Sequence, residues 1–265
     1  MQPTLTIAIR AARAAGRILM RYLDRVDQLH IQAKSQNDFV TEVDRAAEDA
    51  IIHELRSKYP DHAILAEESG ANGKSDFEWV IDPLDGTTNY LHGFPQFSIS
   101  IALRHRGRLE CGIVYDPLRE EMFTAERGGG AQMNDRRIRV ANRLGLEGAL
   151  IGTVFPFSDQ RQLDTYLAMF RTMILNTAGL RRPGSAALDL AYVACGRTDG
   201  FWELGLAEWD MAAGALLINE AGGTVTDLAG GDRYFQTGNI IGGNLKLHRA
   251  LREALQPHLS PSLSA

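Results

Sequence analysis

The stretch from Trp79 to Thr88, WVIDPLDGTT, constrains the fold more than any other part of the chain. It is an apolar run followed by two acids, Asp82 and Asp85, with a proline between them. Because proline fixes φ and lacks an N–H, we expect a buried strand to end at Asp82. Gly86 permits a tight turn, and the following TTNY can begin a helix whose first amides have no internal partner. The sequence therefore predicts that both carboxylates lie at the carboxyl end of a strand, just before a helix.

Such a position suits a metal ion that holds a phosphate. Clefts at strand ends and helix N-termini bind anions, whereas carboxylates in the same place bind a cation. A D-x-x-D pair in a turn is also compatible with a simple helix cap and a solvated acid. Other acids are needed to decide between these interpretations.

Two further stretches supply them. AEES places Glu67 and Glu68 at the end of a short strand, and EWD places Asp210 at the start of a helix, where it can also act as a cap. If Glu67 and Asp210 converge with the D-x-x-D pair, like charges 4 Å apart repel by about 4 kcal/mol at an effective dielectric near 20. Raised pKa values or hard cations relieve that repulsion. Oxygen donors without a neighbouring His or Cys favour magnesium over zinc.

The rest of the first half predicts helices and then a meander. Apolar residues recur at helical spacing from Leu5 to Leu23 and from about Asp44 to Tyr59. The segments FSISIALRH, LECGIVYDP and EMFTAERGGGAQM alternate apolar and polar residues, with turn residues between them. This alternation predicts antiparallel strands, with a β-turn at RGGGAQ.

After NRLGLEG the pattern changes to strand–helix alternation. We expect strands in GALIGTVFP, GFWELG, GGTVTD and NIIGGN. We expect helices from Asp159 to Met173, over SAALDLAYVACG, from Trp209 to Ala221 and from Leu245 to Leu255. A boundary near residue 145 would divide the chain into an α+β part with the first acidic motifs, residues 1–145, and an α/β part that completes the site, residues 146–265.

Composition restricts the location and the partners. The 265 residues carry a net charge of −5, which argues against non-specific binding to nucleic acid or anionic lipid. Arginines interrupt the N-terminal helix where a signal peptide would be apolar, and no run approaches the roughly 18 apolar residues of a membrane helix. Cys111 and Cys195 lie in apolar runs and predict buried free thiols. We expect a soluble cytoplasmic protein without membrane contact.

Taken together, the motifs resemble the inositol monophosphatase family over nearly the whole chain. The strongest are DPLDGTTN and WDMAAG…EAGG, supported by DFVTEVD, AEES, GIVYDP, RRPGSAALDLAYVACG and TGNIIGGN. Within the family, RAARAAGRIL, GSAALDLAYVA and the TGNI end most resemble the bacterial SuhB-type proteins. The resemblance implies a layered αβαβα sandwich of the inositol monophosphatase and fructose-1,6-bisphosphatase type, and a homodimer. It also implies a Mg²⁺-dependent, lithium-sensitive phosphatase that hydrolyses inositol 1-phosphate and similar sugar or polyol monophosphates with metal-activated water.

The resemblance assigns metal and catalytic roles to particular residues. Glu67, Asp82 and the carbonyl of Leu84 are implied to hold one Mg²⁺. Asp82, Asp85 and Asp210 are implied to hold a second, and the participation of a third ion stays open. Thr87 with Glu67 is implied to position the attacking water, and Asp44 to support Thr87.

Substrate contacts follow from the same resemblance. The amides of Gly86 and Thr87 are implied to bind phosphate oxygens. The implied contacts to the hydroxyl groups are Asp85, Ser185, Ala186, Glu203 and Asp210. Glu203 alternates with aromatic residues and can also be a buried structural acid, and Pro183 stands where the family usually has a small or apolar residue. The fine shape of the hydroxyl pocket therefore stays open.

Three functions remain compatible with these residues. The first is the inositol monophosphatase. The second is a phosphatase with the same metal core that acts on fructose 1,6-bisphosphate, adenosine 3′,5′-bisphosphate or NADP. The short segment GANGKSDFE leaves little room for a nucleotide-binding insertion and favours the first.

The third function belongs to a different class. The SuhB resemblance implies an accessory factor of bacterial rRNA transcription antitermination that binds RNA polymerase and Nus factors, with catalysis dispensable. Nothing in the residues themselves indicates such a partner. The local basic segment NDRRIRVANR, Asn134 to Arg143, is either an RNA contact or a solvated edge.

Overall fold

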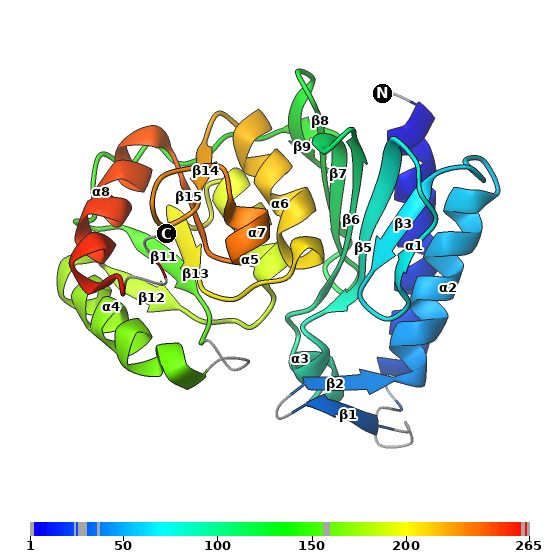
Figure 1. Cartoon of the computed structure of the whole chain (residues 1–265), viewed down its shortest axis with the longest axis horizontal. Helices are drawn as coiled ribbons and strands as arrows, with labels where there is room; N and C mark the ends of the chain where they lie inside the picture. Colours follow the sequence, from blue (N-terminus) through cyan, green and yellow to red (C-terminus); the bar gives the residue numbers. More distant parts are fainter. Residues whose placement is uncertain are drawn as a thin grey trace.

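The structure, a computed structural model, describes residues 3–23, 25, 31–35, 38–155, 160–260 and 263. Helices and sheets alternate in five layers (Figure 1). From right to left in that view these are α1 (Pro3–Leu23) with α2 (Glu42–Arg56), an eight-stranded sheet, α5 (Ala186–Ala194) with α6 (Glu208–Glu220), a five-stranded sheet, and α4 (Leu163–Asn176) with α8 (Leu245–Leu255). The αβαβα sandwich is therefore confirmed.

The larger sheet has the strand order β10-β9-β8-β7-β6-β5-β3-β4. Its strands are β3 (Ala63–Ala66), β4 (Gly70–Asn72), β5 (Phe77–Asp85), β6 (Ser98–His105), β7 (Arg108–Asp116), β8 (Glu121–Glu126), β9 (Gly130–Met133) and β10 (Arg136–Arg137). Every neighbouring pair is antiparallel except β3 with β5. The predicted meander from β6 to β9 is confirmed.

Strand β5 does not end at Asp82, so that prediction was wrong. The strand continues through Pro83 to Asp85, and its register against β6 shifts between Asp82, which pairs with Ser100, and Asp85, which pairs with Ser98. Three steps on β5 thus oppose two on β6, which is a β-bulge. A bulge leaves one residue without a ladder partner and can therefore accommodate a proline. The short helix α3 (Thr87–Leu91) follows, as predicted.

Side-chain alternation in β5 decides which acid faces which layer. Trp79 and Ile81 pack toward α1 and α2, whereas Val80 packs against the core around α5 and α6. Because strand side chains alternate with a period of two, Asp82 shares the face of Val80. The first acid of the motif is therefore directed toward the central helices.

The outer helices on this side pack closely. Helix α1 buries small residues, and a Cβ at its Gly16 would lie 2.7 Å from the ring of Tyr115. Helix α2 begins two residues before the predicted Asp44 and ends at Arg56 rather than Tyr59. Between the two helices lies a hairpin of β1 (Ile31–Ser35) and β2 (Asp38–Thr41), which the sequence analysis did not predict.

The central helices α5 and α6 are buried on nearly every side because a sheet covers each face. They also cross tightly. A Cβ at Gly214 of α6 would lie 2.4 Å from Cβ of Leu190 in α5, so only glycine fits this crossing.

The smaller sheet has the order β12-β11-β13-β15-β14. Its strands are β11 (Leu150–Thr153), β12 (Gly179–Arg181), β13 (Gly200–Glu203), β14 (Thr224–Thr226) and β15 (Ile240–Gly243). Strand β11 is parallel to both β12 and β13, whereas β15 is antiparallel to β13 and β14. Short helical segments complete the chain: η2 (Gln160–Gln162), α7 (Tyr234–Thr237) and η3 (Gln256–His258).

Three further predictions have an outcome here. The predicted start of a helix at Asp159 lies outside the described residues, and α4 begins at Leu163. Cys111 is buried as predicted, but Cys195 is only half-buried. Within the described ranges, no helix combines the length and the apolarity needed to cross a bilayer. The division near residue 145 stays a prediction.

Candidate metal and phosphate site

Three carboxylates from two distant segments converge. Asp82 and Asp85 come from the end of β5, and Asp210 is the third residue of α6. One carboxylate oxygen of each lies within 4.8 Å of the others. Asp82 is 2% exposed and Asp85 8% exposed, while Asp210 is half-buried. Asp210 therefore converges with the D-x-x-D pair, which sequence spacing alone does not reveal, whereas Glu67 is not a member of this group.

The proximity and burial of these acids raise their pKa values. Burial raises the pKa of Asp82 well above its usual range, and the nearby charges of Glu67, Asp85 and Asp210 raise it further. Burial also raises the pKa of Asp210, with Asp85 and Glu67 adding to the effect. Buried carboxylates this close together resist full ionisation unless protons or a cation neutralise them.

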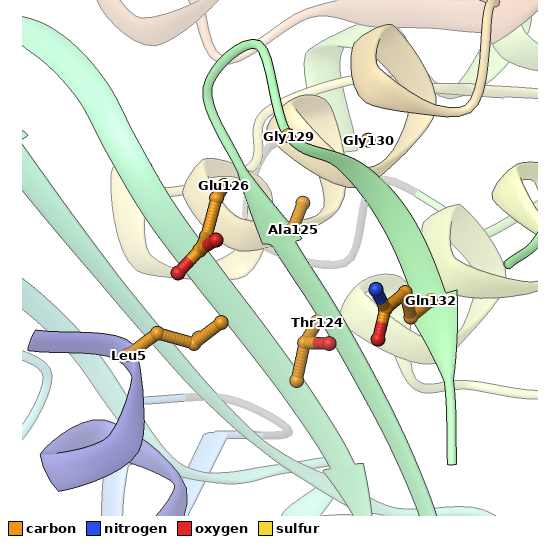
Figure 2. Close-up of a pocket in the computed structure, with 7 residues that line it drawn as sticks. All are labelled: Leu5, Thr124, Ala125, Glu126, Gly129, Gly130 and Gln132. Carbon is orange, nitrogen blue, oxygen red and sulfur yellow. The ribbon is translucent and has the colours of Figure 1, made fainter. Parts of the chain in front are cut away.

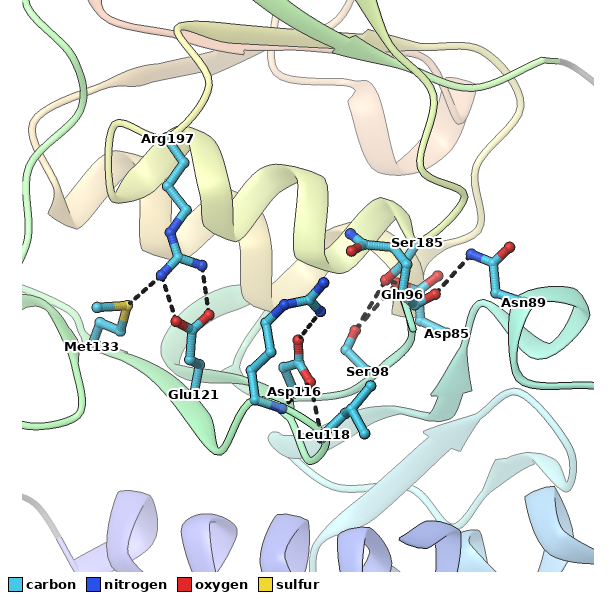
Figure 3. Close-up of polar contacts among 11 residues, drawn as sticks. Asp85, Asn89, Gln96, Ser98, Asp116, Leu118, Glu121, Met133, Ser185 and Arg197 are labelled. Atoms are coloured by element: carbon cyan, nitrogen blue, oxygen red, sulfur yellow. Dashed lines mark hydrogen bonds and ion pairs between the residues drawn. The ribbon is translucent and has the colours of Figure 1, made fainter. Parts of the chain in front are cut away.

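Asp85 is held by the N-terminus of α5 (Figure 3). Its Oδ1 accepts the amide of Ala186 at 3.2 Å, and its Oδ2 accepts the amide of Ala187 at 2.9 Å. The hydroxyl of Ser185 also donates to Oδ2, and that of Ser98 does so at 3.3 Å. Burial raises the pKa of Asp85 to about 6, while the hydrogen bonds from Ser185 and the two amides act to lower it.

The residues present fit a hard divalent cation. The three clustered donors are carboxylate oxygens, which suit Mg²⁺ rather than a thiolate-seeking metal. Burial and the neighbouring carboxylates both raise the pKa values of Asp82 and Asp210, so the ionised groups need neutralising charge. A divalent cation would supply that charge in place of protons.

A second group of contacts surrounds Thr87, the first residue of α3. Its hydroxyl lies 3.2 Å from Oδ1 of Asp44 and 3.0 Å from the carbonyl oxygen of Leu84, and it can donate to either. Asp44 is fully buried in the first turn of α2. The amide of Leu84 donates to Oδ1 of Asp82 at 2.9 Å. Predicted metal ligands and predicted water-positioning residues thus form one connected network.

Glu67 follows β3, and its amide donates to the carbonyl of Ile81 on β5 at 3.1 Å. The next two amides leave the sheet. Those of Glu68 and Ser69 each donate at 2.9 Å to the carboxylate of Glu48, a buried residue of α2. The backbone on both sides of Glu67 is therefore fixed.

Asp210 combines the two roles that the sequence left open. Its Oδ2 accepts the amide of Ala207 at 2.7 Å, so it caps its own helix while lying in the acidic cluster. The start of α6 is anchored from the larger sheet. Arg104 of β6 forms ion pairs with both Glu78 and Glu208, and the hydroxyl of Ser100 donates to the carbonyl of Trp209 at 3.0 Å.

The predicted substrate residues differ in burial and in the contacts that they already make. Ser185 is fully buried and Ala186 is 6% exposed, and both already contact Asp85. Glu203 ends β13 at 4% exposure. Burial is the main cause that raises its pKa well above the usual range, and the nearby charges of Asp210, Asp189 and Asp85 raise it further. Its Oε2 has no hydrogen-bond partner within the described part of the chain.

The turn before α5 is pinned to the metal motif. The side-chain amide of Asn89 lies 2.7 Å from the carbonyl oxygen of Gln96 and 2.8 Å from that of Pro183. Gly86 has φ of 93°, and a Cβ there would lie 2.9 Å from the Gln96 oxygen and 3.1 Å from that of Gly184. The sequence predicted a tight turn at Gly86, but the close approach of Gly184 depends on tertiary packing.

Two hollows lie beside strands of the larger sheet. One, of about 60 Å³, lies between Leu5 of α1 and the β8–β9 hairpin, beside Glu126 and Gln132 (Figure 2). The other, of about 290 Å³, is lined by charged residues that include Lys74, Arg104 and Arg106. Neither lining set contains a predicted site residue.

Sequence reasoning missed Glu48, Arg104 and Asp189. Asp189 is 1% exposed in α5, both of its oxygens lack a partner among the described residues, and burial raises its pKa well above the usual range. A signal existed for Glu48. It lies at the helical spacing of the buried Asp44, Ile51 and Leu55, so an acid occupies the apolar face of α2.

The layered αβαβα fold, with three converging carboxylates at a bulged strand end, defines a class of proteins with a candidate cation site. A model of the inositol monophosphatase family matches residues 1–262. The "Nus factor SuhB" of Pseudomonas aeruginosa is 56% identical to this chain over 269 residues, covering 99% of each. The extragenic suppressor protein suhB of Bartonella henselae has a TM-score of 0.95 at 46% identity, covering 97% of this chain and 100% of that one. The inositol monophosphatase of Anabaena has a TM-score of 0.86 at 41% identity, covering 96% and 95%. The chain belongs to the inositol monophosphatase family.

Proposed function

We propose that the protein is a Mg²⁺-dependent phosphatase that hydrolyses inositol 1-phosphate and similar sugar or polyol monophosphates. The observation that carries the proposal is the convergence of the carboxylates of Asp82, Asp85 and Asp210 within 4.8 Å. Family membership supports it, because the family's members use Mg²⁺. Phosphoryl transfer needs positioning and neutralisation of charge more than covalent help from the protein, and a cluster of oxygen donors supplies the place for both.

We place one Mg²⁺ at Glu67, Asp82 and the carbonyl of Leu84. A second belongs at Asp82, Asp85 and Asp210, and a third stays undecided. When bound, such ions polarise water and neutralise charge on the attacking and leaving oxygens.

The chain's own residues would orient the attacking water. When the Thr87 hydroxyl donates its hydrogen bond to Asp44, the oxygen lone pairs of Thr87 remain free to accept a hydrogen bond from that water. The carboxylate of Glu67 would accept a hydrogen bond from the other O–H of the water. Held from two sides, the water has its own lone pair directed at phosphorus, which is the geometry that an in-line displacement needs.

Substrate binding would use what the internal contacts leave available. We propose that the amides of Gly86 and Thr87 bind the phosphate. The Ser185 hydroxyl and the Ala186 amide already bind Asp85, so their main effect is to orient it. Glu203, with an oxygen that has no partner in the described ranges, and the acceptors of Asp85 and Asp210 would receive the substrate hydroxyls.

A phosphate-release assay tests this function. Inositol 1-phosphate, fructose 1,6-bisphosphate, adenosine 3′,5′-bisphosphate and NADP would be ranked by kcat/KM, with and without Mg²⁺ and with added Li⁺. Asp82→Asn, with a native circular dichroism spectrum, should lose the Mg²⁺-dependent rate, whereas the exposed Asp61→Asn should keep it. Full activity in Asp82→Asn would refute the proposed site. A preference for a nucleotide or a bisphosphate would keep the site and change the substrate.

A second candidate function rests on the comparisons. The relative at 56% identity bears the name of a Nus factor, and it matches 99% of this chain. We propose that this chain also associates with RNA polymerase and Nus factors in rRNA transcription antitermination, with catalysis dispensable. Arg136, Arg137, Arg139 and Arg143 are exposed and form a basic segment available for contact with RNA.

Co-purification tests this second role. An Asp82→Asn protein should retain RNA polymerase as well as the wild type does, because the metal site is not the binding surface. Failure of both proteins to retain RNA polymerase would contradict the role. The homodimer that the family resemblance implies stays a prediction, which sedimentation velocity can test.

A further inference from the structure

Helix α2 buries a second acid, Glu48, four residues after the proposed catalytic residue Asp44. It is 3% exposed, and its Oε2 and Oε1 accept the amides of Glu68 and Ser69, each at 2.9 Å. A buried carboxylate is costly unless hydrogen bonds compensate it, and bonds to a charged acceptor are stronger than neutral ones. These two bonds therefore fix the backbone that follows Glu67.

The direction of three successive amides shows how Glu67 is placed. The amide of Glu67 still belongs to the sheet, because it donates to Ile81 of β5. The next two turn away from β5 and toward α2. Glu48 thus binds the turn that follows β3, at the two residues directly after Glu67.

The same face of α2 carries a second contact with the site. Asp44 precedes Glu48 by four residues, which places the two carboxylates one helical turn apart, about 6 Å along the axis. Asp44 binds Thr87 after β5, and Glu48 binds the turn after β3. One rigid helix therefore contacts both segments that carry the proposed water-positioning residues.

We propose that Glu48 is a positioning residue, which through the amides of Glu68 and Ser69 sets the location of Glu67 relative to Thr87 and thereby the affinity for the Mg²⁺ ion at Glu67. The inference rests on the proposed function. Glu48 touches neither substrate nor metal in this account.

The main test compares Glu48→Gln with Asp49→Asn, a neighbouring exposed residue that undergoes the same change of charge. The glutamine keeps the shape, but its NH₂ group faces one of the two amides, so one hydrogen bond is lost. Mg²⁺ affinity, measured by calorimetry without substrate, should fall about 10–100-fold in Glu48→Gln, as is typical when an outer contact of a metal ligand is removed. Asp49→Asn should match the wild type.

Kinetics separate positioning from a general loss of structure. In Glu48→Gln, kcat should fall and the half-saturating Mg²⁺ concentration should rise, while KM for the monoester changes little because the phosphate contacts lie elsewhere. Glu48→Asp, which keeps the charge but retracts it, should recover part of the Mg²⁺ affinity. Unchanged affinity in a folded Glu48→Gln protein would overturn the proposal.

A measurement on the unmodified protein covers the case in which Glu48→Gln does not fold. The amides of Glu68 and Ser69 should exchange with deuterium much more slowly than those of an open turn, and Mg²⁺ should slow them further. Exchange at the rate of an open turn would also overturn the proposal. If the wild type binds Mg²⁺ but hydrolyses no phosphomonoester, the proposed function fails, while the affinity comparison still tests Glu48.

Discussion

The hydroxyl of Ser185 donates a hydrogen bond to the carboxylate of Asp85, although the two residues are 100 positions apart in the chain. This contact joins the bulged end of β5 to the first turn of α5 (Figure 3). Because the amides of Ala186 and Ala187 bind the same carboxylate, the central helix orients a proposed metal ligand of the larger sheet. The partial positive charge of the helix N-terminus also favours the ionised form of Asp85.

Removing this hydroxyl should weaken the metal site in a pH-dependent way. The bond from Ser185 lowers the pKa of Asp85, so Ser185→Ala should raise that pKa above its present value of about 6. At pH 6.5 the variant should bind Mg²⁺ more weakly than the wild type, with the difference shrinking toward pH 8. Stability without metal should fall by about 1–2 kcal/mol. Calorimetry and urea denaturation measure both effects, with the exposed Ser57→Ala as the control. Identical affinities at pH 6.5 would contradict this prediction.

The metal-free protein should lose stability as the pH rises through the range in which Asp85 ionises. Its pKa is about 6 in the folded protein against an ordinary value of 3.8, so the folded state holds the proton more tightly. The unfolding free energy then decreases from about pH 4 to about pH 6 and levels off above it, by about 3 kcal/mol for this group alone.

Magnesium should reverse that loss, because it binds the ionised carboxylates. The increase in Tm on adding Mg²⁺ should be large at pH 7.5 and small at pH 5. Thermal denaturation at the two pH values measures it, and Asp82→Asn should show a much smaller increase at pH 7.5. An equal Mg²⁺ effect at both pH values would rule out the carboxylate cluster as the binding site.

Gly86→Ala should lower the unfolding free energy by more than the positive φ of this residue alone accounts for. Its φ of 93° is strained for any L-residue, and a Cβ would lie 2.9 Å from the carbonyl oxygen of Gln96. Gly93 has φ of 63° but nothing within 4 Å of a Cβ, so Gly93→Ala isolates the conformational part, on the order of 1 kcal/mol. We expect Gly86→Ala to cost at least about 2 kcal/mol more in urea denaturation. Equal costs would show that the turn relaxes.

Arg104→Met should loosen the start of α6. The substitution keeps an apolar stem but removes the cation shared by Glu78 and Glu208, which lies two residues before Asp210. We expect Mg²⁺ affinity to fall several-fold and stability to fall by about 1 kcal/mol, because the pairs are partly solvated. Arg106→Met is the matched control, since Arg106 and its partner Asp76 are 73% and 59% exposed. A control that weakens Mg²⁺ binding equally would indicate a long-range charge effect instead.

The sequence predicted the parts of the structure that local pattern determines. Alternation defined β6 to β9, helical spacing defined α1, α6 and α8, and the strand-turn-helix signals placed Asp82, Asp85 and Asp210 at element ends. What the pattern could not supply was tertiary. The bulge at Pro83 depends on pairing with Ser98 and Ser100. The hydrogen bonds to Asp85 depend on a helix that begins at Ala186.

The buried acids show the same limit. Glu48 lies on the apolar face of α2, which is a local anomaly, but its partners after β3 become visible only in three dimensions. Asp189 lies inside a helix that is apolar on almost every side, and the sequence alone gives no reason for a carboxylate there. The roles of Glu67, Thr87 and Glu203 stay predictions for the same reason, since they depend on ligands.

The central claim is that the acidic cluster exists to bind divalent cations. A crystal soaked in Mn²⁺, which shares the oxygen preference of Mg²⁺ and scatters anomalously, tests it most directly. We predict an anomalous peak bonded to the carboxylates of Asp82, Asp85 and Asp210, and a second beside Glu67 and the carbonyl of Leu84. Absence of any peak at saturating Mn²⁺, with the carboxylates of Asp82, Asp85 and Asp210 still clustered, would contradict the account.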